Sequence, residues 1–152
     1  MKPNLKIVLS IILVSVLSVQ SSFAADATSN RSDAVAAYHA RFDQQFNEIH
    51  ARLLDAQSKA IGIASVTDLV NVALKDFAEE IELLSNTLDD PNASVDTAVG
   101  YAIEEIGELQ WDVSTIETKL YKVKSIKCVK AKKVKTIRDV APKCPKGFSL
   151  KK

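Results

Sequence analysis

Nine apolar residues between Val95 and Val123 recur in strictly alternating steps of four and three, and this pattern limits the fold more than any other feature of the sequence. Such steps place every apolar side chain on one stripe of an α-helix, whereas a β-strand needs a period of two. The stretch is therefore predicted to be one long helix that buries this stripe. The nine residues are Val95, Val99, Ala102, Ile106, Leu109, Val113, Ile116, Leu120 and Val123.

Two earlier stretches carry the same kind of stripe. The first runs from near Ser32 to Gly62, a residue that suits a helix C-terminus, and the second runs from near Ser65 to Leu88. The second stripe is wider, which suits a helix with neighbours on two sides. The first stripe contains Val35, Tyr38, Phe42, Phe46, Ile49, Leu53, Ala56 and Ala60. The second contains Val66, Val70, Ala73, Phe77, Ile81, Leu84 and Leu88, widened by Leu69, Val72, Leu74 and Leu83.

Polar residues and one proline predict where the three helices begin. We expect Asn30 or Ser32 to cap the first helix. Ser65, with Asp68 three residues later, is expected to cap the second. Pro91 fits a first helical turn but not a helix interior, so the third helix is expected to begin there.

Three helices with two short connections favour an up-down-up antiparallel bundle within one chain. Helices of about 30 residues span roughly 45 Å, so we predict an all-α, elongated fold for this part. The alternative is a self-associating coiled coil, in which the stripe from Val95 to Val123 pairs with its copy in a second chain.

Residues 1–24 have the layout of a cleavable secretory signal. Lys2 and Lys6 precede an apolar run at residues 7–19, and Ser22 and Ala24 are the small residues that a signal peptidase requires. The run is shorter than the about 20 residues that cross a bilayer. We therefore predict a secreted protein, extracellular or at the cell envelope, cleaved after Ala24.

Charge is segregated along the rest of the chain. Residues 25–118 carry five basic and eighteen acidic side chains, a net charge of −13. Residues 119–152 carry thirteen basic side chains and one acidic side chain, a net charge of +12. Because such a shift marks a module boundary, we expect an acidic three-helix bundle at 25–123 and a basic tail at 124–152.

Cys128 and Cys144 are the only cysteines, and both lie in the basic tail. An even number in an exported chain favours a disulfide, which would contribute about 3 kcal/mol by closing a loop of this size. Residues 126–130 and 134–140 flank a turn at 131–133, so the tail is predicted to be a disulfide-closed β-hairpin. Metal binding or redox catalysis would need CxxC spacing or a nearby histidine, and the tail has neither.

The tail contains the runs IKCVKAKKVK, from Ile126, and VAPKCPKGF, from Val140. These runs resemble a short tail of secreted actinobacterial proteins, of the form TCVKGKxxKKVTxxxPKCPxGYKK. The cysteine spacing matches, whereas Ala131 stands where that tail has glycine and Phe148 stands for its tyrosine. The resemblance covers about 25 residues and none of the helical part. It implies export and a Gram-positive envelope, but no reaction.

Motifs for catalysis or cofactor binding are missing, including HExxH, CxxCH, GxSxG and a glycine-rich phosphate loop. His39 and Asp43 form an i, i+4 pair that supplies at most half a metal site. Glu104, Glu105 and Glu108 fit a solvated helix face. We therefore predict a protein that is not an enzyme and has no cofactor or metal.

Two groups of residues are candidate contacts. Trp111 and Ile103 lie off the apolar stripe, and the Trp111 ring is expected either to fold over Gly107 or a neighbouring helix, or to contact a partner or a second chain. A lysine-rich hairpin can bind polyanions by counterion release. Its candidate contacts are Lys127, Lys130, Lys132, Lys133, Lys135, Lys143 and Lys146.

The leading hypothesis is an exported, non-enzymatic helical-bundle protein associated with the cell envelope. Its basic tail would contact an anionic envelope polymer, a membrane surface, or an acidic body, its own or that of another copy. No specific nucleic-acid partner is expected. The alternative is a small-ligand or metal carrier that uses the bundle interior.

Overall fold

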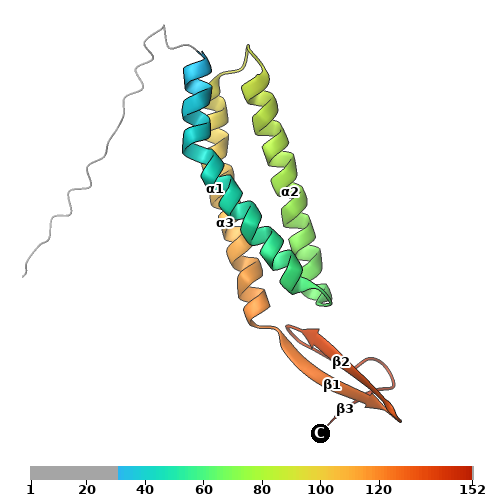
Figure 1. The fold of residues 1–152 in the computed structure, drawn as a ribbon. Coiled ribbons are helices and arrows are strands. Elements are labelled where there is room, and N and C mark those ends of the chain that lie inside the picture. The colour runs from blue at the N-terminus through green and yellow to red at the C-terminus, as the bar shows by residue number, and fades with distance from the viewer. Residues whose placement is uncertain (1–30, 152) are drawn as a thin grey trace, which may run out of the picture.

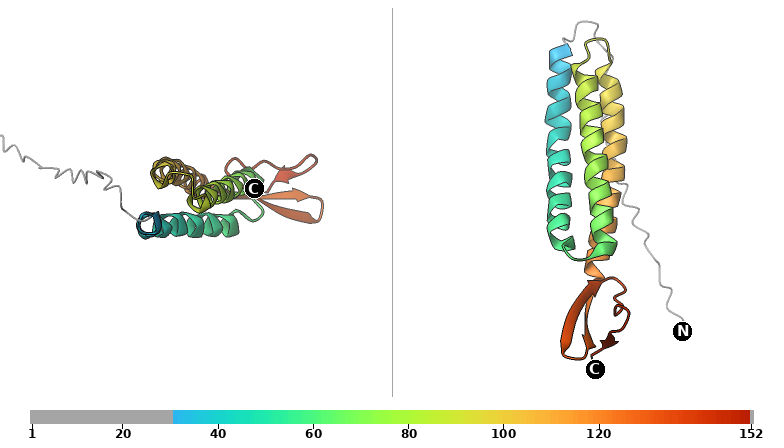
Figure 2. Two further views of the ribbon diagram at one scale, coloured as in Figure 1. Left: turned by 90° about the horizontal axis from the view of Figure 1, so that it is seen from above. Right: turned by 90° about the vertical axis from the view of Figure 1, so that its right-hand side faces the viewer.

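The computed structural model describes residues 31–151, so the predicted signal at residues 1–24 lies outside the described part. Three helices lie side by side along their length (Figures 1 and 2). The predicted antiparallel bundle within one chain is confirmed, since α3 packs against both other helices. The helices are α1 (Arg31–Ala60), α2 (Ala64–Asp89) and α3 (Val95–Tyr121).

The chain changes from helix to strand at residues 122–123, and the basic tail forms a small antiparallel sheet beyond the end of the bundle (Figure 1). The predicted disulfide-closed hairpin is confirmed. A short third strand pairs with the other edge of the first, which gives the strand order β2-β1-β3. The strands are β1 (Lys124–Lys130), β2 (Lys133–Asp139) and β3 (Ser149–Leu150).

The predicted stripes of α1 and α2 form most of the core. In α1 every stripe residue from Tyr38 to Ala60 is buried, and in α2 only Ile81 is half-buried. In α3 Ala98 is buried, whereas Val99 packs only partly against the core. A strict seven-residue repeat drifts by about 20° per heptad around a straight helix, so one stripe cannot stay centred on the core along the whole of α3.

The wide apolar face expected for α2 is only partly buried. Leu74 packs against the core, but Leu69, Val72 and Leu83 are 38%, 57% and 46% exposed. Both neighbours of α2 lie on the same side of it in a three-helix bundle, so they cover one stripe and leave its flank in water.

The starts of α2 and α3 differ from those predicted. α1 is described from Arg31, so Ser32 lies inside the helix, and the predicted cap Asn30 lies outside the described residues. The N-cap of α2 is Ile63, which makes no side-chain cap, while Ser65 lies inside the first turn and donates to another part of the chain. Ser94 caps α3 by accepting the Asp96 N–H, and Pro91 lies in the preceding connection.

A local turn explains the late start of α3. The Asp90 carboxylate accepts the Asn92 N–H at 2.9 Å, which holds the segment around Pro91 in a turn and delays the start of α3 to Val95. Gly62 ends the turn after α1 with a φ of +77°, as expected for a helix C-terminus.

The Arg31 guanidinium connects the start of α1 to the end of α2, at the end of the bundle opposite the basic tail. It donates to the carbonyls of Leu88 at 2.8 Å and Asp90 at 2.6 Å, and also to those of Thr87 and Ala93. These carbonyls belong to the end of α2 and to its connection with α3, where helical hydrogen bonds run out. One side chain from α1 therefore satisfies the exposed end of its neighbour.

Two adjacent leucines allow a direct test of the core. Leu53 is 0% exposed and Leu54 is 47% exposed, and both lie in the C-terminal third of α1. Leu53→Ala is expected to lower the free energy of unfolding by about 3 kcal/mol, because it leaves a cavity in a packed interior. Leu54→Ala should lower it by less than about 1 kcal/mol. Urea unfolding followed by circular dichroism measures both, and equal losses would contradict this packing.

Arg31→Ala should destabilise the bundle by about 2 kcal/mol, because it removes charge-assisted hydrogen bonds to carbonyls that have few other partners. Arg41→Ala, on the exposed side of the same helix, is the control; its guanidinium lies over the Phe42 ring, so its loss should cost less, about 0.5–1 kcal/mol. Hydrogen exchange should show the loss first at the end of α2, and unchanged protection there would argue against the role of Arg31.

Candidate functional site

The basic tail is organised around its disulfide. Cys128 lies in the middle of β1 with 0% exposure, and it is bonded to Cys144 in the segment that follows β2. Pro142 and Pro145 flank Cys144 and keep this segment out of the sheet, as predicted. The Lys151 N–H then donates to the Lys127 carbonyl at 2.8 Å, so the end of the chain returns to β1.

The turn between β1 and β2 retains a backbone conformation that suits glycine. Ala131 has a φ of 50°, in the left-handed region. Alanine in that region costs roughly 1–2 kcal/mol relative to glycine. The turn nevertheless forms, with Lys130 paired to Lys133.

All seven candidate lysines are exposed, and the sheet distributes them over two faces. The register places Lys130, Lys133 and Lys135 on the face of Cys128, and Lys127 on the opposite face. Lys130 and Lys133 are directly opposite each other, an arrangement that destabilises a hairpin by repulsion. Lys132 occupies the turn, and Lys143 and Lys146 lie beside Cys144.

Within residues 31–151, no tail lysine forms an ion pair. The four ion pairs of this part all join helix residues, one of them Arg52 of α1 with Glu117 of α3 at 2.7 Å. The tail's one acidic residue, Asp139, accepts the Ser65 hydroxyl at 2.6 Å. This hydrogen bond lowers the pKa of the Asp139 carboxyl, with backbone hydrogen bonds from Val140 and Ala141 adding to the effect. The lysine charges are therefore not neutralised inside the described chain.

The tail meets the bundle through a small junction. Ser65 of α2 bonds to Asp139 of β2, and Val140 and Val123 pack partly against the end of the core. Arg138 lines a surface hollow together with Asp55 and other residues of α1 and α3. The strands of the hairpin extend away from the helices rather than along them (Figure 2).

Trp111 is an exposed aromatic side chain on α3, as is Tyr121 at the end of that helix. Trp111 is 69% exposed, and Ile103 is 52% exposed. A side-chain carbon placed on Gly107 would have no atom within 4 Å, so the ring of Trp111 does not fold over Gly107 as one expectation held. Of the alternatives for this residue, exposure is therefore the one observed.

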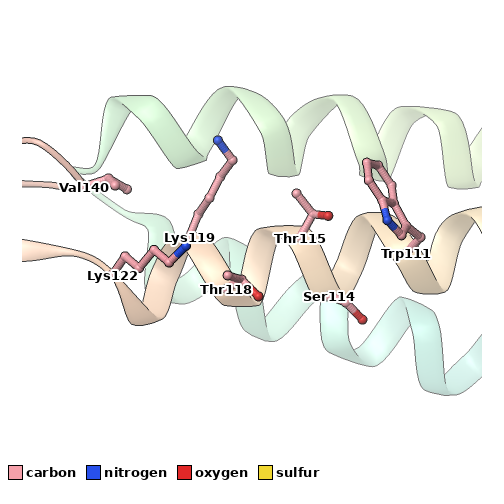
Figure 3. Close-up of a pocket in the computed structure, with 7 residues that line it drawn as sticks. All are labelled: Trp111, Ser114, Thr115, Thr118, Lys119, Lys122 and Val140. Atoms are coloured by element: carbon pink, nitrogen blue, oxygen red, sulfur yellow. The ribbon is translucent and has the colours of Figure 1, made fainter.

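A shallow hollow of about 420 Å³ runs from Trp111 toward the tail. Figure 3 shows Trp111, Thr115 and Lys119 projecting to the same side from successive turns of α3, with Val140 at the tail end of the hollow. A second hollow of about 430 Å³ lies on the other side of Trp111, beside Gly107.

The histidines and acidic residues considered as catalytic or metal-binding candidates do not come together in one site. His39 contacts Asp43 at 3.0 Å, and both are exposed on α1. His50 stacks on the Phe77 ring, with centroids 4.9 Å apart. Partial burial, followed by repulsion from Glu80 of α2 and from acids on α3, raises the pKa of Glu105.

The described part of the chain contains no group of three histidine, cysteine, aspartate or glutamate side chains that could hold a metal ion. Between Arg31 and Lys151, none of the helices has the length and apolarity needed to span a bilayer. The disulfide fits an oxidising environment such as the outside of the cell.

Sequence reasoning did not identify Arg31 or Ser65 as contact residues. Both act on segments far away in the sequence, and neither belongs to a local motif that marks such a role. Exposed Lys124, Arg138 and Lys151 add to the positive surface of the tail. The basic composition of the tail is the sequence signal that could have identified these three residues.

Comparison with known proteins found no family model, no curated protein and no solved structure that matches the chain.

The disulfide should stabilise the tail without being needed by the bundle. In a Cys128→Ala/Cys144→Ala variant we expect the tail to lose about 3 kcal/mol of stability and to be cleaved rapidly by trypsin at its lysines. The helical circular dichroism signal should persist, because the core of α1, α2 and α3 contains neither cysteine. Equal trypsin resistance of the variant and the parent protein would contradict this division.

Proposed function

We propose that the protein is an exported, non-enzymatic envelope protein whose basic hairpin binds anionic polymers. The observation that carries this proposal is the set of exposed tail lysines without an ion pair in residues 31–151, including the like-charged pair Lys130 and Lys133. Repulsion of this kind is relieved when phosphate or carboxylate groups bind, and the release of counterions adds to the affinity.

The bundle supports the tail in this proposal. Its core between Arg31 and Lys151 contains no buried polar or charged side chain, so we place no small ligand in the interior. The acidic helices repel a polyanion, which confines binding to the end of the molecule where the hairpin lies (Figure 1).

Export is part of the same proposal. Residues 1–24 have the features of a secretory signal, and the closed Cys128–Cys144 bond fits a compartment outside the reducing cytosol. The polyanions met there are phosphate-rich wall polymers. Anionic membrane headgroups offer similar charges on a flat surface, and the experiment below distinguishes binding to them from binding to a polymer.

The test uses immobilised long-chain polyphosphate and the protein produced from its full 152-residue sequence. We expect retention to fall steeply between about 50 and 200 mM salt, as for other polyanion complexes. A Lys133→Gln/Lys135→Gln variant should elute at clearly lower salt. A Lys59→Gln/Lys75→Gln variant changes the net charge by the same amount on the bundle and should elute like the parent protein.

Equal shifts in the two variants would show that net charge rather than the hairpin governs binding, and would overturn the proposal. Anionic phosphatidylglycerol vesicles provide the comparison. Stronger retention on vesicles than on polyphosphate would replace the polymer by a membrane surface. Retention of neither would remove the polyanion role of the tail.

A further inference from the structure

The outer face of α3 contains two glycines that its own chain does not need. Gly100 and Gly107 lie inside the helix, where glycine is unfavourable because it loses the most backbone freedom. A side-chain carbon at either position would meet no atom within 4 Å. Neither glycine has a left-handed backbone, so the fold gives no reason for the missing side chains.

Trp111 lies on the same face, away from the core. It is two residues, and hence about 200°, from both Leu109 and Val113, which are buried. Hollows on both sides of its ring leave it standing as a ridge, with Gly107 in one hollow and Thr118 in the other. A second copy of this face can complement its shape, because the protruding aromatic ring of each copy fits into the space beside the glycine of the other.

Charge along this face decides what would cover it. Asp96 and Glu104 lie in the N-terminal half of α3, and Lys119 and Lys122 lie at its C-terminal end. Glu108, which lines the hollow beside Trp111, is a third acid on this face. A parallel copy would place all like charges together, whereas an antiparallel copy places Asp96 of each chain near Lys122 of the other and brings only the two Glu108 side chains toward each other.

We propose that α3 pairs with α3 of a second copy in an antiparallel, two-fold symmetric dimer. In this register Trp111 of each chain lies on Gly107 of the other, and Gly100 faces Thr118. The same register brings Asp96 of one chain opposite Lys122 of the other. Two-fold symmetry makes every contact occur twice, so a short face contributes two tryptophans to the centre of the interface.

The dimer is distinct from polyanion binding, because none of the seven candidate lysines lies on α3. The first test of the dimer measures the molar mass of the protein by sedimentation at about 150 mM salt, where long-range attraction between exposed charges is screened. We expect a dimer that dissociates on dilution. Trp111→Glu should weaken it at least about thirtyfold, as loss of a central aromatic contact does.

Two further variants separate loss of contact from loss of folding. Val72→Glu makes the same change at an exposed apolar residue of α2 and should leave the dimer intact. Gly107→Leu should abolish the dimer by blocking close approach, yet should raise the melting temperature of the diluted monomer, because leucine favours helix over glycine. A monomer at all concentrations, or dissociation by Val72→Glu but not by Trp111→Glu, would overturn the proposal.

Zero-length carbodiimide crosslinking tests the orientation. Asp96 and Lys122 are 26 positions apart, roughly 39 Å along a helix, so an amide bond between them can form only between chains. We expect an Asp96–Lys122 crosslinked peptide in the dimer by mass spectrometry, and its loss in Asp96→Asn. A dimer that yields no such peptide in the parent protein would rule out the antiparallel register.

Discussion

Burial of one apolar stripe from each helix is the constraint on which the rest of the structure depends. Twenty hydrophobic residues from the bundle form a single core, and the part of the chain from Arg31 to Lys151 places no polar side chain inside it. Such a core fixes which helix faces meet but supplies little directional bonding of its own. Directional contacts instead lie outside the core, at Arg31 on one end of the bundle, at Ser65 on the other, and at the Arg52–Glu117 pair between α1 and α3.

The tail is stabilised in a different way. Its sheet has only one fully buried side chain, Cys128, and a lone hairpin without a core is marginal in water. The covalent bond to Cys144 therefore does for the tail what the apolar stripe does for the helices. Because the two parts rely on separate interactions, the tail can carry repelling lysines without weakening the bundle.

Periodicity in the sequence predicted what depends on local geometry. The buried faces of α1 and α2, the two connections and the disulfide follow from spacing, from Gly62 and from the two cysteines. One failure arose where a distant partner competes with a local preference, and another where one local preference outweighs a second. Ser65 bonds to Asp139 rather than capping its helix, and an Asx turn at Asp90 holds Pro91 outside α3.

Exposure was harder to predict than burial, because it depends on segments that lie far away in the sequence. Leu69, Val72 and Leu83 have the composition of a buried face, but only the positions of the neighbouring helices decide that they remain in water. Trp111 left two alternatives open until the neighbours of Gly107 were known. The lysines of the candidate site could be identified from composition, whereas their division between two sheet faces required the register.

Placing the hairpin at one end of an elongated bundle gives the molecule a permanent electric dipole along its long axis (Figure 1). Near a negatively charged surface, the electric field of the surface turns the molecule so that the hairpin points toward the surface and the acidic helices point away from it before contact occurs. A single molecule would then stand upright, with its Arg31 end roughly 45 Å beyond the hairpin. In an antiparallel pair the two dipoles cancel, so the same surface would hold the pair lying flat with a hairpin at each end.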